Sequence, residues 1–233
     1  MIYLDNIDNE IKKEILVTLK EIMTKYPSLN HSISLISDGD YLIDYVSSHY
    51  KKSLNLEQSC KDDTTLFTTT AQWNSTSINM INVYSVYDFL LKTRPDFIAI
   101  GVNKRRNYEE VTAKMQKGYN LGYTYSRNIR DVIYHEIGHV FSILFKMSNI
   151  TMVKNILDEN IRTNKDISVY SKNNPEEMIA EAFSKYSYDP RYNDVVYVIG
   201  SIIEEFYTKF ESTDLFEISG KSLIKTKGKL WYI

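Results

Sequence analysis

The chain is poor in cysteine, in net charge and in long apolar runs, and each shortage excludes a class of protein. With Cys60 as the only cysteine among 233 residues, an intramolecular disulfide is impossible. A formal net charge of -2 argues against nucleic acid as the main partner, because phosphate binding needs an excess of basic residues. The longest apolar stretch, residues 195–203, is interrupted by Gly200 and Ser201 and is too short to span a bilayer. We therefore expect neither a nucleic-acid-binding nor a membrane-spanning protein.

The N-terminal sequence also lacks the pattern of a signal peptide. It turns polar directly after Met1-Ile-Tyr-Leu, without a basic stretch followed by an apolar run. We expect a soluble, monomeric protein without a Sec signal of its own. Such a protein is either cytoplasmic, or exported by another route, or derived from a precursor whose leader has been removed. The scarcity of cysteine permits a reducing compartment, but it does not exclude secretion.

The first forty residues carry one helical pattern and one strand pattern. A helix is predicted between Asp8 and Pro27, because apolar residues recur there at spacings of three and four, namely Ile11, Ile15, Leu19, Ile22 and Tyr26. A short strand is predicted at residues 31–36, and the turn signal Asp38-Gly39 ends it.

Three further strands are predicted before residue 103, and helices follow them. The β-rich runs 66–73 and 78–84 are most simply interpreted as the two strands of a hairpin. Another strand is predicted at residues 97–102, from Phe97 to Val102. From about residue 108 to residue 210, helical periods dominate the sequence. Strands first and helices afterwards indicate an α+β fold rather than alternating βαβ units.

The sequence contains no internal repeat and no long linker, which predicts one domain over residues 1–233. Within it we expect a helix-plus-sheet subregion, residues 1–103, whose small sheet is mixed or antiparallel. Residues 104–233 are expected to be mainly helical. Near the end, the lysine-rich run 221–229 is interpreted as a solvated edge strand or tail rather than as a basic docking patch.

The most informative stretch is His135-Glu136-Ile137-Gly138-His139. Residues four apart on an α-helix are rotated by only about 40° and separated by a rise of about 6 Å, so both imidazoles can reach one metal ion. Glu136 is about 100° round the helix from His135, where it can take a proton from a metal-bound water. The chain has only four histidines, so two of them in this pattern favour a metal site over a chance pair.

The flanks of this motif predict the helix that it requires. Asn128 is the expected N-cap, and Asp131 stands three residues later in the capping-box position. An apolar face is predicted on the side away from the histidines, made of Ile133, Ile137, Val140, Phe141 and Leu144. Gly138 costs a helix interior about 1 kcal/mol relative to alanine. We expect a close approach of another helix or of a ligand to offset this cost.

A catalytic zinc site needs a third protein ligand and leaves the fourth position to water. A second helix is predicted downstream, with Asn174 as its cap and Pro175 in its first position, running through Phe183. Glu177 and Glu181 lie four apart on one face of this helix. Glu177 is either a metal ligand or a capping residue, because a glutamate three residues after a cap can reach back to it. Spacing alone also leaves open whether Glu177 or Glu181 binds the metal.

These motifs resemble the gluzincin peptidases related to the anthrax lethal factor catalytic domain and to the bacterial Pro-Pro endopeptidases. The resemblance is carried by His135-Glu-Ile-Gly-His139, by Tyr170 and by Glu177-Met-Ile-Ala-Glu-Ala-Phe183. It covers residues 97–188, whereas the N-terminal third matches only in its general helix-and-strand character. It implies a zincin-like metallopeptidase fold, with the active-site helix in the helical half, and a zinc-dependent endopeptidase that hydrolyses a protein or peptide.

The resemblance implies one zinc ion held by His135, His139 and Glu177, and it thereby decides for Glu177 over Glu181 as the ligand. Glu136 matches the general base. In this mechanism zinc polarises the scissile carbonyl, and the glutamate carries a proton from the water to the leaving amine.

Tyr170 matches the family tyrosine that hydrogen-bonds the oxyanion, and Glu181 matches a glutamate that orients a ligand histidine. In this architecture the substrate is expected to lie extended along an edge strand, for which residues 97–102 are the candidate. The predicted lining of the cleft consists of Trp73, Tyr123 and Tyr125.

Two other functions compatible with the same residues remain open. One is a catalytically silent, zinc-stabilised interaction module, such as a component of a phage or of a toxin system. Retention of both Glu136 and Tyr170 argues against it, since a degenerate site is expected to lose one of them. The other is an intracellular regulatory HExxH protease that cleaves a repressor, which fits the missing signal peptide. The identity of the substrate cannot be predicted from these motifs, because specificity depends on loops.

Overall fold

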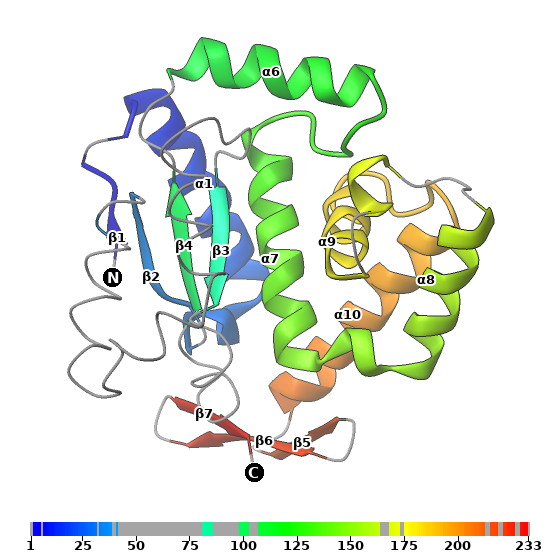
Figure 1. The fold of residues 1–233 in the computed structure, drawn as a ribbon. Helices are drawn as coiled ribbons and strands as arrows, with labels where there is room; N and C mark the ends of the chain where they lie inside the picture. Colours follow the sequence, from blue (N-terminus) through cyan, green and yellow to red (C-terminus); the bar gives the residue numbers. More distant parts are fainter. Residues whose placement is uncertain are drawn as a thin grey trace, which may run out of the picture.

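The computed structural model describes residues 2–5, 7–31, 33–38, 41, 81–85, 98–102, 107–163, 168–172, 175–212, 215–218, 221–226 and 229–232. Figure 1 shows a sheet on one side of the molecule, a group of helices on the other, and helix α7 (Ile129–Phe145) between them. Over the described residues the fold is therefore of the predicted α+β type. No helix among them combines the length and the apolarity that crossing a membrane requires.

The first helix forms as its sequence pattern predicts. Helix α1 (Asn9–Lys25) begins after Asp8, whose carboxylate accepts hydrogen bonds from the backbone N–H groups of Glu10, at 3.0 Å, and Ile11, at 3.3 Å. The predicted apolar face is buried along its whole length, from Ile11 to Tyr26. A single 3-10 turn, η1 (Pro27–His31), then leads the chain into the sheet.

The larger sheet in the described residues is mixed, with strand order β1-β2-β4-β3. Its strands are β1 (Ile2–Tyr3), β2 (Ile33–Asp38), β3 (Ile81–Ser85) and β4 (Ile98–Val102). Strand β2 pairs parallel with both β1 and β4, whereas β3 pairs antiparallel with β4. Residues 66–73 of the predicted hairpin lie outside the described residues.

The prediction that residues 97–102 form an edge strand is wrong. Strand β4 lies between β2 and β3, and its backbone pairs on both sides, so it cannot accept an added strand. Phe97 itself lies outside the described residues. Among the described strands, β1 and β3 form the two edges of this sheet, and β3 is the edge strand that packs against α7. The partner of a strand can lie far away in sequence, which is why the local pattern did not reveal this order.

The helical part consists of four more long helices and two 3-10 turns in the described residues. The helices are α6 (Tyr108–Asn120), α8 (Thr151–Thr163), α9 (Pro175–Tyr186) and α10 (Asp194–Ser212), and the turns are η2 (Met147–Asn149) and η3 (Tyr170–Lys172). Helix α7 packs against both α1 and α9, and α9 packs in turn on α10. This arrangement places α7 at the centre of the molecule (Figure 1).

Phe141 of α7 shows how the two halves share one core. Its fully buried ring contacts Tyr26 at 5.0 Å, Phe183 of α9 at 5.3 Å and Tyr207 of α10 at 5.8 Å between ring centroids. All of the apolar face predicted for α7 is buried in this same cluster. The helix that carries the histidines is therefore anchored through Phe141 to aromatic rings from three other parts of the chain.

The chain ends in a structure that was not predicted. Strands β5 (Leu215–Ile218), β6 (Lys221–Thr226) and β7 (Lys229–Tyr232) form a three-stranded antiparallel sheet, in the order β5-β6-β7. The lysine-rich run was interpreted as a tail or a single edge strand, but it includes the central strand β6. Residues 104–233 are thus helical only up to α10.

Candidate metal centre

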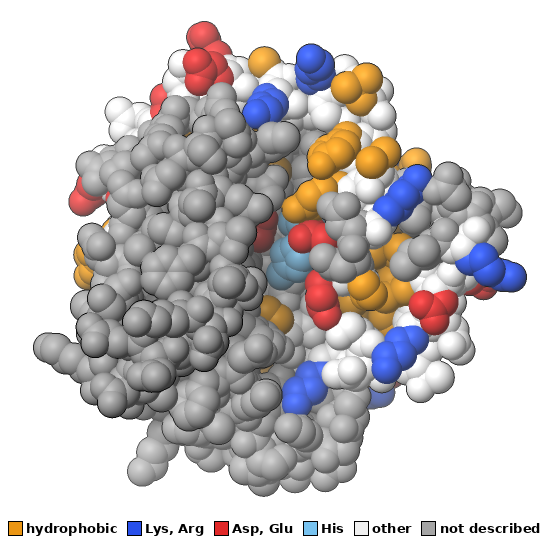
Figure 2. Space-filling model, in the orientation of Figure 1, with side chains coloured by type: hydrophobic (Ala, Val, Ile, Leu, Met, Phe, Trp, Pro, Cys, Tyr) orange, Lys and Arg blue, Asp and Glu red, His pale blue; other side chains and the backbone are white. Residues whose placement is uncertain are grey.

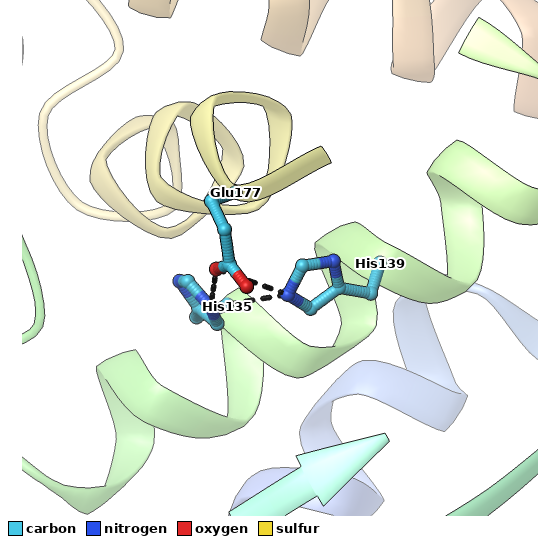
Figure 3. Close-up of side chains that lie close together, drawn as sticks. All are labelled: His135, His139 and Glu177. Carbon is cyan, nitrogen blue, oxygen red and sulfur yellow. Dashed lines mark hydrogen bonds and ion pairs between the residues drawn. The ribbon is translucent and has the colours of Figure 1, made fainter. Parts of the chain in front are cut away.

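The start of α7 is fixed by Asn128, as predicted. The Asn128 side chain accepts a hydrogen bond from the backbone N–H of Asp131 at 3.0 Å. The Asp131 carboxylate reaches back to the backbone N–H of Arg127, also at 3.0 Å, and not to that of the cap residue. The capping box is therefore displaced by one residue. Helix α7 then continues without a break through His135 and His139, one turn apart on the side that faces α9 (Figure 3).

Helix α9 brings the candidate third ligand to the histidines. It begins at Pro175, as predicted, while the expected cap Asn174 lies outside the described residues. Ser142 of α7 donates a hydrogen bond to Glu176, which ties the first turn of α9 to α7. The neighbouring Glu177 points from this first turn toward both imidazoles (Figure 3). The close approach predicted at Gly138 is that of α9, whose Ala180 lies directly opposite.

Three donor atoms form a nearly equilateral triangle. His135 Nε2 lies 3.2 Å from His139 Nε2, and Glu177 Oε2 lies 3.2 Å from the first nitrogen and 3.4 Å from the second. Atoms bound to one tetrahedral zinc ion at about 2.0–2.1 Å are separated from each other by about 3.3–3.4 Å. Two imidazoles and one carboxylate are a donor set of catalytic zinc sites. These residues therefore fit a metal ion in both chemistry and spacing, as the sequence predicted.

The charges in this triangle are unusual for side chains in a protein interior. Burial lowers the pKa of His135, but the carboxylates of Glu177 and Glu181 outweigh burial and raise the pKa well above 6.5. Burial also raises the pKa of Glu177, but His135 and His139 outweigh it and lower the pKa below 4.5. The two carboxylates thus favour the protonated form of His135 in the metal-free centre. A cation held between the same atoms would compete with that proton.

The triangle is also open to the surface on one side. The side chains of His139 and Glu177 are 19% and 18% exposed, whereas that of His135 is 8% exposed. In Figure 2 histidine surface is visible from outside the molecule, with acidic and hydrophobic side chains around it. A metal ion held there has room for a fourth ligand from the solvent, which is the condition for a catalytic rather than a structural site.

Glu181 occupies the position predicted for a glutamate that orients a histidine. It is 1% exposed, and its Oε1 lies 3.0 Å from Nδ1 of His135. The same carboxylate accepts hydrogen bonds from the hydroxyl of Thr124 at 2.7 Å, the backbone N–H of Tyr125 at 2.6 Å and the hydroxyl of Ser168 at 2.8 Å. The roles of Thr124 and Ser168 were not predicted, because no motif links them to a helix that far along the chain.

Tyr170 lies beside the metal centre, as predicted. Its ring centroid is 5.9 Å from that of His135, and the ring of Tyr123 is 5.8 Å away on its other side. Tyr123 is 40% exposed and therefore suits the predicted lining of a cleft. The ring of Tyr125 packs instead against Tyr192 at 5.5 Å. Trp73, the remaining predicted lining residue, lies outside the described residues.

Glu136, the predicted general base, lies on α7 next to His135 and is 5% exposed. Its position about 100° round the helix from His135 places it beside the three ligands rather than among them. The structure thus brings the three predicted ligands together with Glu181 and Tyr170, from α7, α9 and the turn η3.

No protein-family model, curated protein or solved structure matches this chain. The resemblance to the gluzincins therefore remains a prediction that depends on the motifs and on the geometry of these side chains.

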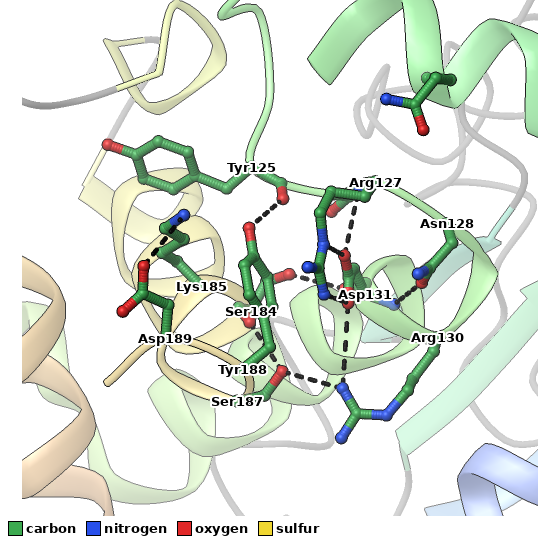
Figure 4. Close-up of polar contacts among 12 residues, drawn as sticks. Tyr125, Arg127, Asn128, Arg130, Asp131, Ser184, Lys185, Ser187, Tyr188 and Asp189 are labelled. Atoms are coloured by element: carbon green, nitrogen blue, oxygen red, sulfur yellow. Dashed lines mark hydrogen bonds and ion pairs between the residues drawn. The ribbon is translucent and has the colours of Figure 1, made fainter. Parts of the chain in front are cut away.

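A second polar cluster supports the centre from the N-terminal end of α7 (Figure 4). Asp131 is fully buried and forms an ion pair with Arg127, from Oδ2 to Nε at 2.7 Å. The Arg127 guanidinium stacks on the ring of Tyr188 at 3.4 Å, and the Tyr188 hydroxyl donates to the backbone carbonyl of Tyr125 at 2.7 Å. Ser184 of α9 donates to the carbonyl of Asp131 at 2.7 Å. This cluster fixes α7, α9 and the segment before α7 relative to each other.

Proposed function

We propose that this chain is a zinc-dependent endopeptidase with a zincin-like fold, in which His135, His139 and Glu177 hold one zinc ion. The observation that carries the proposal is the triangle of two imidazole nitrogens and one carboxylate oxygen, whose edges of 3.2, 3.2 and 3.4 Å match those of a tetrahedral zinc site. The resemblance of the motifs to the gluzincins supports the same conclusion. The partial exposure of the triangle supports a catalytic site.

The proposed mechanism assigns one task to each residue. Zinc held by His135, His139 and Glu177 would supply Lewis acidity for a bound water and for the scissile carbonyl. Glu136 would take the proton of the water and deliver it to the leaving amine. Tyr170 donates a hydrogen bond to the developing oxyanion from the side of His135. Glu181 keeps the His135 imidazole oriented, because its carboxylate lies 3.0 Å from Nδ1 and leaves Nε2 to face the metal.

Strand β3 replaces β4 as the proposed substrate strand. An extended peptide needs an unpaired strand edge, and β4 pairs on both of its sides. Of the described strands, β3 is at the edge of the sheet and in contact with α7. We therefore propose that the substrate backbone pairs alongside β3 and crosses the metal centre in an extended conformation.

The experiment that tests this function is cleavage profiling on a peptide library with zinc-loaded protein. We expect internal cleavage that stops when a chelator removes the metal and returns when zinc is restored. The matched control is Glu136→Gln, which keeps the size of the side chain and all three metal ligands but removes the base. Zinc binding without cleavage of any library peptide would favour the silent interaction module. Cleavage that survives in Glu136→Gln would contradict the assigned mechanism.

A further inference from the structure

The side chain of Ser168 connects two parts of the candidate site, and the proposed mechanism assigns it no role. It is 2% exposed and lies two residues before Tyr170. Its hydroxyl donates to Oε2 of Glu181 at 2.8 Å, and it lies 2.6 Å from the hydroxyl of Ser171. The backbone N–H of Ser171 also donates to the Ser168 oxygen, at 3.1 Å. A single side chain therefore contacts both helix α9 and the turn that carries the tyrosine.

The hydrogen bonds of Ser168 run in one direction. Its single hydroxyl proton goes to Oε2 of Glu181. The oxygen of Ser168 then accepts from Ser171, through both the hydroxyl and the backbone N–H. The second of these bonds spans three residues, in the manner of a helix cap, and it closes the turn η3 around Tyr170. Ser168 therefore connects this turn to the buried carboxylate of Glu181.

A neighbouring segment is fixed to the same carboxylate. The backbone N–H groups of Val169 and Tyr170 donate to the carbonyls of Gly122, at 3.1 Å, and Tyr123, at 2.9 Å, which pairs the two segments like short strands. Gly122 has a φ of 68°, a left-handed conformation that suits glycine, and it turns the chain into this pairing directly after α6. The next residue along, Thr124, donates to Glu181 at 2.7 Å. Both paired segments are therefore hydrogen-bonded to the side chain of Glu181.

We propose that Ser168 is a positioning residue for Tyr170, and that it acts by binding the carboxylate that also orients the metal ligand His135. This inference rests on the proposed function, because it concerns the tyrosine that serves the oxyanion. Glu181 contacts His135 with one oxygen, at 3.0 Å, and Ser168 with the other, at 2.8 Å. The Glu181 carboxylate, and not the chain segment between α8 and α9 alone, thereby sets the distance between Tyr170 and the metal centre.

The test compares two serine-to-alanine variants of the full-length protein. Ser168→Ala removes the proposed contact. Ser37→Ala is the matched control, because it removes an equally buried serine hydroxyl that donates to the carbonyl of Asp38 in the sheet and not to Glu181. The first readout is the ¹⁹F resonance of 3-fluorotyrosine placed at position 170 alone, in chelator-treated and zinc-loaded protein. We expect Ser168→Ala to shift this resonance and Ser37→Ala to leave it unchanged. An unchanged resonance in folded Ser168→Ala overturns the proposal, whether or not the protein cleaves peptides.

The second readout is a double-mutant cycle, in which the kinetics of Ser168→Ala, of Tyr170→Phe and of the double variant are compared with those of the wild type. Because the tyrosine acts in the transition state, Ser168→Ala is expected to lower kcat about tenfold with little change in KM. The double variant is expected to be no slower than Tyr170→Phe alone, since a positioning residue has no effect once its target hydroxyl is absent. The proposal would be overturned if Ser168→Ala lowered kcat by the same factor in the Tyr170→Phe background as in the wild type. If Ser168→Ala does not fold, Ser168→Cys, which keeps the size but donates weakly, replaces it in both readouts.

Failure of this inference and failure of the proposed function are distinguishable. A protein that binds zinc but cleaves no peptide fails the cleavage assay, while the ¹⁹F comparison still decides the role of Ser168. A protein that cleaves peptides with an unshifted ¹⁹F resonance in Ser168→Ala keeps the proposed function and loses the inference.

Discussion

A Cβ atom on Gly138 of α7 would lie 2.7 Å from the Cα of Ala180 on α9, so the two helix backbones touch at this point. In an open helix, Gly138→Ala would add about 1 kcal/mol of stability. Here the added methyl meets backbone that cannot rotate away, so we expect the free energy of unfolding to fall by about 2 kcal/mol. Displacement of α9 also moves Glu177, and we expect zinc affinity to fall about tenfold. Thermal unfolding and chelator competition measure the two effects.

Gly118→Ala is the matched control for that substitution. Gly118 lies inside helix α6, and a Cβ there meets only the methyl group of Thr124, at an ordinary 3.5 Å. We expect this variant to gain up to about 1 kcal/mol of stability and to keep its zinc affinity. If Gly138→Ala behaves like Gly118→Ala, the close contact between α7 and α9 is not what holds the ligands together.

The pH dependence of stability is expected to differ between metal-free and zinc-loaded protein. In the metal-free protein the pKa of His135 is raised above 6.5 by Glu177 and Glu181, which outweigh burial. A raised pKa in the folded state stabilises the protein below pH 6.5, and this contribution is lost as the pH rises through the folded pKa. The lowered pKa of Glu177 acts in the other direction, stabilising above pH 4.5 and losing its effect as the pH falls.

We therefore expect the Tm of chelator-treated protein to fall as the pH is raised above about 6.5 and through the raised pKa of His135. Zinc displaces the proton of His135, so the zinc-loaded protein should lack this component and its advantage in Tm should grow with pH. The control is chelator-treated His135→Gln, in which the alkaline fall is expected to be smaller than in the wild type. Identical pH profiles for the wild type and this variant would show that His135 carries no proton in the metal-free fold.

Substitution of Asp131 tests the second polar cluster, at the N-terminal end of α7, independently of metal binding. Its buried carboxylate accepts from the Nε of Arg127 at 2.7 Å and from the backbone N–H of the same residue at 3.0 Å. Asp131→Ala leaves the guanidinium without its counter-charge, and we expect a loss of about 3 kcal/mol in the free energy of unfolding. Zinc stoichiometry measured on the folded fraction is expected to remain one. Stability close to that of the wild type would mean that this ion pair does not hold the start of α7.

The features predicted correctly from the sequence depend on residues close together along the chain. The cap Asn128 and the first-turn Pro175 each act within about four residues, so a short window contains both partners of the interaction. The same holds for His135 and His139, which meet because they are one helical turn apart. The starts of helices α1, α7 and α9 were therefore predicted close to those observed.

The features that were missed depend on partners far apart in sequence. Strand β4 pairs with β2, some sixty residues earlier, and this pairing turns the predicted edge strand into an internal one. Glu181 binds Thr124 and Ser168, which lie 57 and 13 residues away. A serine or threonine hydroxyl has no periodicity that would reveal such a bond, whereas two histidines on one helical face do.

The central claim is that Glu177 is a metal ligand and not only a residue at the start of a helix. Calorimetric titration of zinc into chelator-treated protein tests it, with Glu177→Gln compared against Glu176→Gln, the neighbouring glutamate bonded to Ser142. We predict one zinc ion per chain for the wild type and for Glu176→Gln, with similar affinities. For Glu177→Gln we predict an affinity lower by about 100-fold or more. Zinc binding by Glu177→Gln with wild-type affinity would contradict the account.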